Sequence, residues 1–375
     1  MIQTDTRIKV IHIAGNARIG GVAAFLLNYF RYADTKKFRF DFVTYGRSDF
    51  DDAVHEIDSS SKIFYIPSFQ KDPLAAMRAL KRIYRSDHYA IVHSHMTTLS
   101  AFALPPAAKA GIPVRICHAH SAFDKNSDHY LIKKLLRPFA AARATALAAC
   151  SVHAARNLFA KKAETAAIIP NAIPAERFIC TETERGKARE TLHFLERTVL
   201  FVGRFVYQKN LFFLLDAFAK ALQSREMTLI LVGDGKDKGE LLAYARARGI
   251  DGHIKFVPPC DPAVYYKAAD LFVLPSRYEG LGMVAIEAQA GGVPCLLSDA
   301  VPKEADISGA CRFLPALSDK DAELWAHAMA EDAPRIQDAA ERIEKAGYDI
   351  RKEAHLLTDY YKKLLSEKGL WDGQP

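Results

Sequence analysis

Two glutamates and a glycine-rich bend mark the part of this sequence best suited to bind a polar ligand. Residues 276–299 read SRYEGLGMVAIEAQAGGVPCLLSD, and Glu279 and Glu287 stand on either side of the bend GLGM. Carboxylates held in place accept hydrogen bonds from ligand hydroxyl groups. Backbone amides at the start of a helix attract anions. The stretch therefore predicts a site for an elongated ligand that carries both hydroxyl groups and an anionic group.

The elements around the bend form a strand, a turn, a helix and a second strand. Residues 270–275 are apolar and β-prone and end at a proline, which indicates a short buried strand. Gly280 and Gly282 permit a sharp turn. The pattern VAIEAQA favours a helix from about Met283 to the glycine pair at 291–292, and an apolar strand follows. This order is typical of a parallel α/β sheet.

Both halves of the chain repeat this alternation. The first half opens with a predicted strand at 8–15, and the second with one at 198–203; a loop and a helical run follow each. The pattern predicts an α/β protein with two Rossmann-like, doubly wound domains facing each other across a cleft. We place the domains at 1–180 and 181–348, because apolar periodicity is lost between them. The amphipathic segment 349–375 is expected to form a C-terminal helix and tail that cross back to the first domain.

Three features suit an anion at the carboxyl ends of the strands, where open parallel sheets bind their ligands. Gly21 belongs to a glycine pair behind the first strand, where bare amides can approach a phosphate. Arg204 and Lys209 lie in the loop behind the first strand of the second half and could clamp a diphosphate. The helix behind Gly282 adds its N-terminal dipole. Together these features predict a diphosphate site.

Composition sets limits on the class of protein. The chain has 375 residues, of which 50% are hydrophobic and 25% charged, as in globular proteins of two domains. No apolar run is long enough for a membrane span, and the N-terminus has no signal-peptide pattern. The six cysteines form no C-x-x-C pair, so we expect a reduced, cytoplasmic protein. A net charge of +7 favours an anionic partner.

Taken together, the motifs resemble the retaining glycosyltransferases of family four, which have two Rossmann-like domains in the GT-B fold. The resemblance covers nearly the whole chain and rests on Glu279-x7-Glu287, VGRFVYQKN, VGDG at 232–235 and IIPNAIPAERF at 168–178. The segments GGVPCLLSDAVPKEADI and HSHMTTLSAF look like the branch that builds bacterial capsular polysaccharide and exopolysaccharide. The resemblance implies sugar transfer, with retention of configuration, from a nucleoside-diphosphate sugar. The donor is expected to be a UDP-sugar, and the acceptor a saccharide or a saccharide linked to a lipid pyrophosphate.

The resemblance also implies roles for single residues. Glu279 would contact hydroxyl groups of the donor sugar, and Glu287 would bind the nucleotide ribose. Gly21 would approach the phosphates from the first domain. No metal ion or other cofactor is expected, because side chains and backbone amides would hold the diphosphate in its place. These diphosphate-binding residues are Arg204, Lys209, Leu281, Gly282, Met283 and Val284.

A histidine behind a strand of the first domain is expected near the reacting carbon. The strand ends Cys117-His-Ala-His-Ser121, so His118 and His120 are both candidates. His120 is preferred, because a following serine or threonine is typical of the family.

Other functions stay open. A sugar-nucleotide epimerase or hydrolase could have the same fold. The pairs His93/His95 and His118/His120 could give a zinc hydrolase four ligands, since residues two apart share one face of a strand. A nucleic-acid partner is not expected: Phe123, Tyr130 and Phe139 do stand among basic residues, but the segment LIKKLLRPFA is explained more simply as an amphipathic helix.

The segment 131–139 has an amphipathic pattern that suits a membrane surface. Between residues 131 and 139, leucines and Phe139 alternate with Lys133, Lys134 and Arg137. This amphipathic pattern predicts contact with an anionic membrane surface, which would make the enzyme peripheral on the inner face of the cell membrane. The alternative is that the apolar side packs onto the domain's own core.

Overall fold

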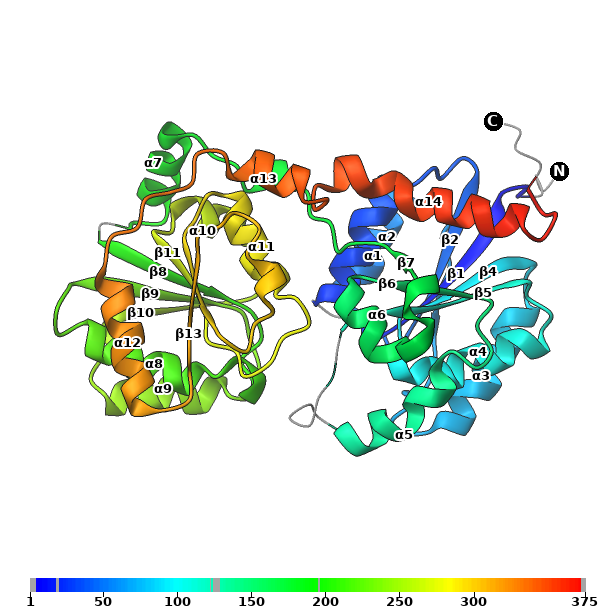
Figure 1. The fold of residues 1–375 in the computed structure, drawn as a ribbon, viewed down its shortest axis with the longest axis horizontal. Coiled ribbons are helices and arrows are strands. Elements are labelled where there is room, and N and C mark those ends of the chain that lie inside the picture. The colour runs from blue at the N-terminus through cyan, green and yellow to red at the C-terminus, as the bar shows by residue number, and fades with distance from the viewer. Residues whose placement is uncertain (1–4, 18–19, 122, 124–128, 195, 372–375) are drawn as a thin grey trace. The chain divides into compact units, whose positions relative to one another are not determined.

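The computed structural model of the protein describes residues 5–17, 20–121, 123, 129–194 and 196–371. It divides into two compact units (Figure 1). Unit 1 comprises residues 1–173 together with 350–375, and unit 2 comprises residues 174–349. The domain boundary that we place after residue 180 lies a few residues beyond this division.

Unit 1 is built on a parallel sheet of seven strands in the order β3-β2-β1-β4-β5-β6-β7. Strands and helices alternate along the chain, as the sequence predicts, and every strand pair is parallel. The strands are β1 (Ile8–Gly15), β2 (Phe38–Thr44), β3 (Ile63–Tyr65), β4 (Tyr89–Ser94), β5 (Val114–Ala119), β6 (Ala146–Ala149) and β7 (Ala167–Ile168). The helices between them are α1 (Gly21–Arg31), α2 (Asp49–Ile57), α3 (Pro73–Arg85), α4 (Ser100–Lys109), α5 (Tyr130–Ala140) and α6 (Val152–Phe159).

Apolar side chains cover both faces of this sheet because successive residues of a strand point to opposite faces. On β1, Val10 packs into one hydrophobic core while Ile11 and Ile13 pack into the other. The strands therefore read as nearly continuous apolar runs, as expected for a parallel sheet with helices on both sides. The helices lie on both faces of the sheet in Figure 1.

The helix α14 (Ile350–Ser366) is the C-terminal element and belongs to unit 1, which confirms the predicted return of the chain to the first domain. Its buried side chains Leu357, Tyr361 and Leu365 share the core of α1 and β2. The Tyr360 hydroxyl donates a hydrogen bond to the carbonyl oxygen of Leu147 in β6 at 2.7 Å. Segments far apart in sequence are thus joined in one core.

Unit 2 has a parallel sheet of six strands in the order β10-β9-β8-β11-β12-β13. The predicted strand, turn, helix and strand around Glu279 and Glu287 are confirmed as β11, a loop, α11 and β12. The strands are β8 (Arg197–Val202), β9 (Met227–Val232), β10 (Ile254–Val257), β11 (Leu271–Leu274), β12 (Cys295–Ser298) and β13 (Cys311–Leu314). The helices are α7 (Glu182–Thr191), α8 (Leu211–Ala221), α9 (Lys238–Ala247), α10 (Ala263–Ala268), α11 (Met283–Ala290), α12 (Asp319–Ala330) and α13 (Ala339–Lys345).

Glycines of the VGDG segment let two loops of unit 2 cross in contact. The Phe205 amide donates to the Asp234 carbonyl at 2.8 Å. A Cβ atom on Gly233 would lie 1.9 Å from the Gly203 oxygen, and one on Gly235 would lie 2.2 Å from the Phe205 oxygen. Only glycine fits at these two positions, and the close contact fixes the loop that carries Arg204.

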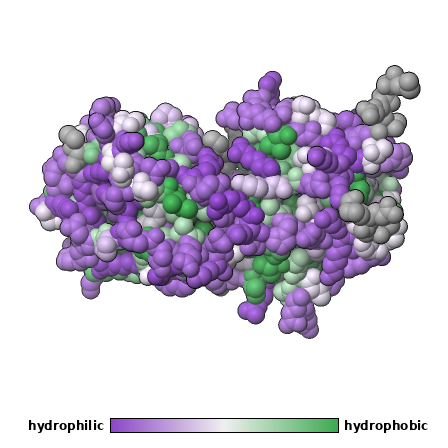
Figure 2. Space-filling view, turned by 90° about the horizontal axis from the view of Figure 1, so that it is seen from above, coloured by the Kyte–Doolittle hydropathy of each residue, from purple (hydrophilic) through white to green (hydrophobic). Residues whose placement is uncertain are grey.

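The face of the molecule in Figure 2 is mainly hydrophilic, with smaller hydrophobic patches between the polar side chains. Among the described helices, none combines the length and the apolar character needed to cross a membrane.

Candidate functional site

A buried ion pair joins two of the predicted site residues in unit 2. Lys209 ends a short 3-10 turn behind β8, and Glu279 lies in the loop between β11 and α11. The Lys209 Nζ atom is 2.5 Å from Glu279 Oε1, and the two side chains are only 11% and 9% exposed. The Ser276 hydroxyl donates to the same carboxylate oxygen at 2.6 Å. Because β8 and β11 are neighbours in the sheet, their loops meet at its carboxyl edge.

Further hydrogen bonds hold these two loops in register. The Gln208 side-chain amide donates to the Tyr278 carbonyl at 2.9 Å, and the Arg277 amide donates to the Gln208 carbonyl at 2.8 Å. The Arg277 guanidinium lies 4.4 Å from the centre of the Tyr207 ring. Arg204, by contrast, is exposed, and its Nη2 atom is 3.5 Å from Gln208 Oε1. The lysine is therefore fixed, whereas the arginine carries its charge at the surface.

The helix α11 begins at the glycine bend that separates the two glutamates. Gly282 has the left-handed conformation, with φ of 85°, and its carbonyl accepts the Ala285 amide at 2.8 Å. The amides of the first helical turn have no partner within the helix, so Met283 and Val284 offer N–H groups to an anion. Leu281 is buried beside them. The structure thus brings the four predicted backbone positions, 281–284, into one helix N-terminus.

Glu287 lies on α11 and is held by a tyrosine that sequence reasoning missed. The Tyr266 hydroxyl lies 3.0 Å from Glu287 Oε2 and 3.1 Å from the Val284 carbonyl oxygen, so both oxygens are within reach of its one proton. Burial of the carboxyl group raises the pKa of Glu287 to about 7, although the Tyr266 hydrogen bond acts in the opposite direction. This carboxyl group therefore changes its charge near neutral pH. No motif around Tyr266 indicated this contact.

The histidines of unit 1 form a cluster at the carboxyl ends of β1, β4 and β5. His118 is fully buried within β5, whereas His120 follows the strand and is partly exposed. One row of hydrogen bonds joins His12 Nδ1 to His95 Nε2 at 2.9 Å and His95 Nδ1 to His120 Nε2 at 2.7 Å. The rings of His118 and His120 stack with their centres 3.9 Å apart.

A second row of hydrogen bonds ends at His118. The Tyr361 hydroxyl is 2.6 Å from His93 Nδ1, and His93 Nε2 is 3.0 Å from His118 Nδ1. Burial lowers the pKa of all five histidines, to about 3 for His12 and His120 and well below the usual value for the other three. The imidazoles are therefore neutral at neutral pH.

The zinc interpretation of the histidine pairs can be tested on these distances. The pairs do lie together, and two groups of three histidines have ligand atoms within 4.8 Å of one another. Zinc bonds of about 2.0–2.1 Å in a tetrahedral site separate ligand nitrogens by about 3.3 Å. The linked nitrogens here are 2.7–3.0 Å apart, which is hydrogen-bonding distance. The cluster is thus arranged as a hydrogen-bonded network, and a metal would have to spread its rings.

Gly21 is the first residue of α1 and is exposed. A Cβ atom there would meet no other atom within 4 Å, so the backbone is open to a ligand at this point. One turn further along α1, the Phe25 ring packs against the rings of His118 and His120, with centres 5.1 and 4.9 Å apart. The helix start and the histidine cluster are therefore connected through Phe25. Residues 18 and 19 of the same loop lie outside the described residues.

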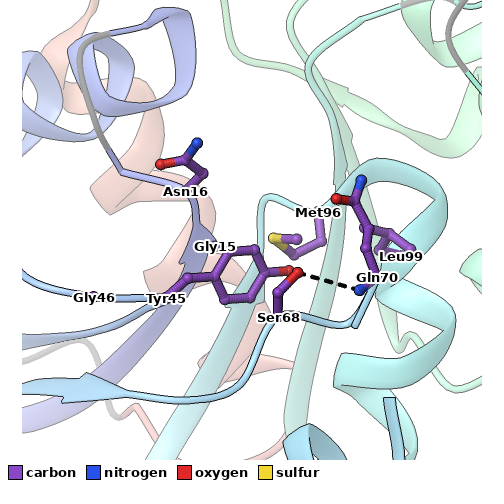
Figure 3. A pocket seen from close by; sticks show the side chains of 8 residues that line it. All are labelled: Gly15, Asn16, Tyr45, Gly46, Ser68, Gln70, Met96 and Leu99. Carbon is purple, nitrogen blue, oxygen red and sulfur yellow. Dashed lines mark hydrogen bonds between the residues drawn. The ribbon is translucent and has the colours of Figure 1, made fainter. Parts of the chain in front are cut away.

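A pocket of about 480 Å³ opens at the carboxyl edge of the unit 1 sheet (Figure 3). Its lining residues are all uncharged: Gly15, Asn16, Tyr45, Gly46, Ser68, Gln70, Met96 and Leu99. Gly15 has φ of 67°, and a Cβ atom there would lie 2.6 Å from Met96 Sδ and 3.3 Å from the Tyr45 ring. Tyr45 and Met96 can therefore approach the backbone closely only because this residue is glycine.

The helix α5 exposes its apolar side chains. Ala140 is its one buried residue, while Leu131 and Leu135 are 77% and 70% exposed and Phe139 is 58% exposed. This exposure contradicts the alternative in which these side chains pack onto the core of their own domain. The helix presents apolar side chains to the outside, next to Lys134 and Arg137.

Comparisons with known proteins agree with this arrangement. The family model "Glycosyl transferases group 1" matches residues 186–347, and the model "Glycosyltransferase Family 4" matches residues 19–177. A protein of Bacillus subtilis (strain 168), provisionally described as the glycosyltransferase EpsF, is 31% identical over 94% of this chain and 96% of its own length.

Two further relatives bear on fold and chemistry. The UDP-Gal:alpha-D-GlcNAc-diphosphoundecaprenol alpha-1,3-galactosyltransferase of Escherichia coli is 24% identical over 98% of this chain and 100% of its own. The crystal structure of Anabaena Alr3699/HepE with UDP and glucose matches with a TM-score of 0.80 at 17% identity, covering 95% of this chain and 100% of that one. The predicted GT-B fold is confirmed by this match. With family models on both halves and a relative above 30% identity along nearly its whole length, the chain belongs to family 4 of the glycosyltransferases.

Proposed function

We propose that the protein transfers a hexose from a UDP-sugar to a saccharide acceptor, free or linked to a lipid pyrophosphate, with retention of anomeric configuration. The product would be an intermediate of capsular polysaccharide or exopolysaccharide. The observation that carries the proposal is the Lys209–Glu279 pair beside the open amides of α11, with Glu287 on the same helix. A cation, a helix N-terminus and two carboxyl groups at one sheet edge match the parts of a nucleoside-diphosphate sugar.

The choice of UDP is supported by relatives. The name of the Escherichia coli enzyme specifies UDP-Gal, and Anabaena HepE has been crystallised with UDP-glucose. The first of these enzymes also acts on a diphosphoundecaprenol-linked sugar, which supports a lipid-pyrophosphate acceptor here. Relatives named for capsular polysaccharide and teichuronic acid synthesis, CapH of Staphylococcus aureus and TuaC of Bacillus subtilis, support the polymer class.

In the proposed donor site, charge that develops on the departing UDP is stabilised by groups already in place. Lys209 and Arg204 supply positive charge, and the first turn of α11 supplies N–H groups. Glu279 would exchange part of its bond with Lys209 for hydroxyl groups of the sugar, and Glu287 would accept those of the ribose. These contacts require no metal ion, so binding in EDTA is the direct test of a metal-independent site.

In unit 1, we assign the contact with the donor sugar to His120 and a supporting role to His118. Of the two rings, only His120 has surface that a ligand can reach, and His118 lies behind it at stacking distance. Gly21 would present its amide to the diphosphate. The uncharged pocket around Tyr45 would hold a sugar ring of the acceptor, because hydroxyl, amide and aromatic groups suit a neutral saccharide.

We assign α5 to the surface of an anionic membrane. Leucine and phenylalanine side chains that are more than half exposed, next to basic residues, suit the boundary between headgroups and acyl chains. Such contact would bring the enzyme to a lipid-linked acceptor on the cytoplasmic side.

The first experiment is calorimetric titration of the protein with UDP, GDP, ADP and NAD in the presence of EDTA. Micromolar binding of UDP alone is expected. Binding that appears only after a divalent metal is added would overturn the metal-independent site, and no binding of any nucleotide would overturn the transferase.

Product analysis with a UDP-sugar then separates the remaining alternatives. An epimerase would release an isomeric sugar without an acceptor, and a hydrolase would release free sugar at full rate. A transferase would need an acceptor for full turnover, and NMR of the new glycosidic bond would show the anomeric configuration of the donor.

A further inference from the structure

A hydroxyl group of the C-terminal helix is hydrogen-bonded to the histidine cluster of unit 1. Tyr361 of α14 contacts His93 at 2.6 Å, although 268 residues of sequence separate them. Burial raises the pKa of the Tyr361 phenol well above its usual value, so the hydroxyl keeps its proton. Within the described part of the chain, His93 Nδ1 is the one acceptor found for that proton. If His93 donated instead, the Tyr361 O–H would have no acceptor and His118 Nε2 would have no donor. Donation by Tyr361 leaves one of these groups without a partner among the described residues and not two, so the hydroxyl donates to His93 Nδ1.

Donation from Tyr361 to His93 determines which nitrogen carries the proton in His93 and then in His118. A neutral histidine whose Nδ1 accepts a hydrogen bond carries its proton on Nε2. His93 therefore donates from Nε2 to His118 Nδ1, at 3.0 Å. His118, neutral in its turn, must then carry its own proton on Nε2. That atom is buried and has no hydrogen-bonding partner among the described residues.

The end of this row lies against the proposed active-site histidine. The His118 ring stacks on His120 at 3.9 Å, with an angle of 24° between the planes. A change of tautomer would reverse the dipole of the His118 ring beneath His120 and turn its unpartnered Nε2 from a donor into an acceptor. In a buried, poorly solvated cluster such a change is felt strongly by neighbouring groups.

We propose that Tyr361 is a positioning residue, which through His93 holds His118 in the Nε2–H tautomer and so sets the polarity of the ring beneath His120. The proposal rests on the proposed function, because it assumes that His120 contacts the donor sugar. It assigns a role in turnover to a helix that lies outside the sequence motifs of the site.

The chain offers a matched control on the same helix. Tyr360, the neighbour of Tyr361, also donates a hydrogen bond from a partly buried hydroxyl, but its acceptor is the Leu147 carbonyl and not the histidine cluster. Tyr360→Phe and Tyr361→Phe remove the same group from adjacent positions. A comparable loss of stability is expected for both. Any difference between them in histidine tautomers or in turnover is therefore specific to the hydrogen bonds that run from Tyr361 through His93 to His118.

The experiment combines NMR with kinetics on the full chain. Proton–nitrogen correlation spectra of protein labelled with ¹⁵N-histidine report the tautomer of each ring, and turnover is measured with UDP-glucose and UDP-galactose. We expect Nε2–H for both His93 and His118 in the natural protein and in Tyr360→Phe. In Tyr361→Phe, loss of one hydrogen bond is expected to shift the tautomer ratio about tenfold and to lower kcat by a similar factor, while the dissociation constant of UDP changes less than twofold.

Each contrary result has a separate meaning. A proton on His118 Nδ1 in the natural protein, or equal kcat in the two variants, would overturn the role of Tyr361 even if UDP-sugar turnover is intact. Stoichiometric zinc in the purified protein, with both histidine N–H signals lost, would overturn it in favour of a metal site. Absence of turnover in the natural protein would instead overturn the proposed function.

Discussion

Acidification is expected to unfold unit 1 selectively, because its five clustered histidines, four of them buried and His120 partly exposed, are held without charge. An unfolded histidine takes up a proton at pH values below about 6.5. The folded cluster resists protonation, since burial lowers the pKa of each ring, to about 3 for His12 and His120. Below pH 6.5 the unfolded state therefore binds more protons than the folded state, and stability falls as pH falls.

The size of the effect follows from this linkage. Between pH 7.5 and 5.5, each histidine that stays neutral in the folded state costs about 1.4 kcal/mol, and five cost about 7 kcal/mol. Whole domains are stable by only about 5–15 kcal/mol. The strongly depressed carboxyl pKa values of unit 1, such as that of Asp87, affect stability only at much lower pH.

Unit 2 is expected to respond with the opposite sign. Burial raises the pKa of Glu287 to about 7, so between pH 7.5 and 5.5 the folded state binds more protons than the unfolded state. Stability of this unit therefore rises as pH falls, by about 2 kcal/mol. Glu287→Gln removes the titrating group and should abolish the rise.

Each unit contains one of the two tryptophans, which makes the assay specific. Trp325 is buried in unit 2, and Trp371 stacks on Phe38 in unit 1 with ring centres 6.0 Å apart. Urea unfolding is followed by fluorescence in Trp371→Phe, which reports unit 2, and in Trp325→Phe, which reports unit 1. At urea m-values of about 1–3 kcal/mol per molar, the unit 1 midpoint should fall by at least about 2 M between pH 7.5 and 5.5. A unit 1 midpoint that does not change with pH, or that shifts in the same direction as that of unit 2, would refute the reasoning.

The remaining predictions concern ligands. Lys209→Ala should raise the dissociation constant of UDP at least tenfold in calorimetry, roughly the loss of one charge-assisted hydrogen bond, while Lys345→Ala, at an exposed lysine of α13 in unit 2, should leave it unchanged. Glu279→Gln should leave UDP binding equal or tighter, because Lys209 is released from its carboxylate, yet should lower kcat at least tenfold with a UDP-sugar; natural kcat would contradict its contact with the sugar. Leu131→Glu should weaken flotation with anionic liposomes, whereas Leu317→Glu, at a similarly exposed leucine of unit 2, should not; equal flotation of both variants would contradict the membrane surface.

The sequence predicts the fold well because its signals are local. Apolar strands bounded by glycine and proline, such as Leu271–Leu274, and amphipathic helices, such as Ile350–Ser366, form where expected. The glycine bend at 280–282 and the glutamate spacing likewise indicate the loop and helix that we propose to bind the donor. These features depend on residues only a few positions apart, so a pattern in one chain is sufficient to reveal them.

Partners contributed from distant segments could not be predicted in the same way. Tyr266 contacts Glu287 across 21 positions of sequence, and Tyr361 contacts His93 across 268. A tyrosine on an amphipathic helix gives no sign that its hydroxyl points at a histidine of another strand. His12 shows where a signal existed: it occupies the first strand at a position that pairs with His93, but only the strand register makes this visible.

The buried carboxyl group of Glu287, which Tyr266 contacts, also affects the stability of unit 2. A glutamate with its pKa raised to about 7 costs folding free energy at pH 7.5, and Glu287→Gln should therefore stabilise the ligand-free unit 2 by about 3 kcal/mol at most. An ordinary structural position would favour glutamine or a hydrophobic residue there. A carboxylate is useful only if a ligand with hydroxyl groups offsets its cost, so UDP should stabilise the natural unit 2 more than the variant. Equal stabilisation of both by saturating UDP would show that Glu287 has no contact with the ligand.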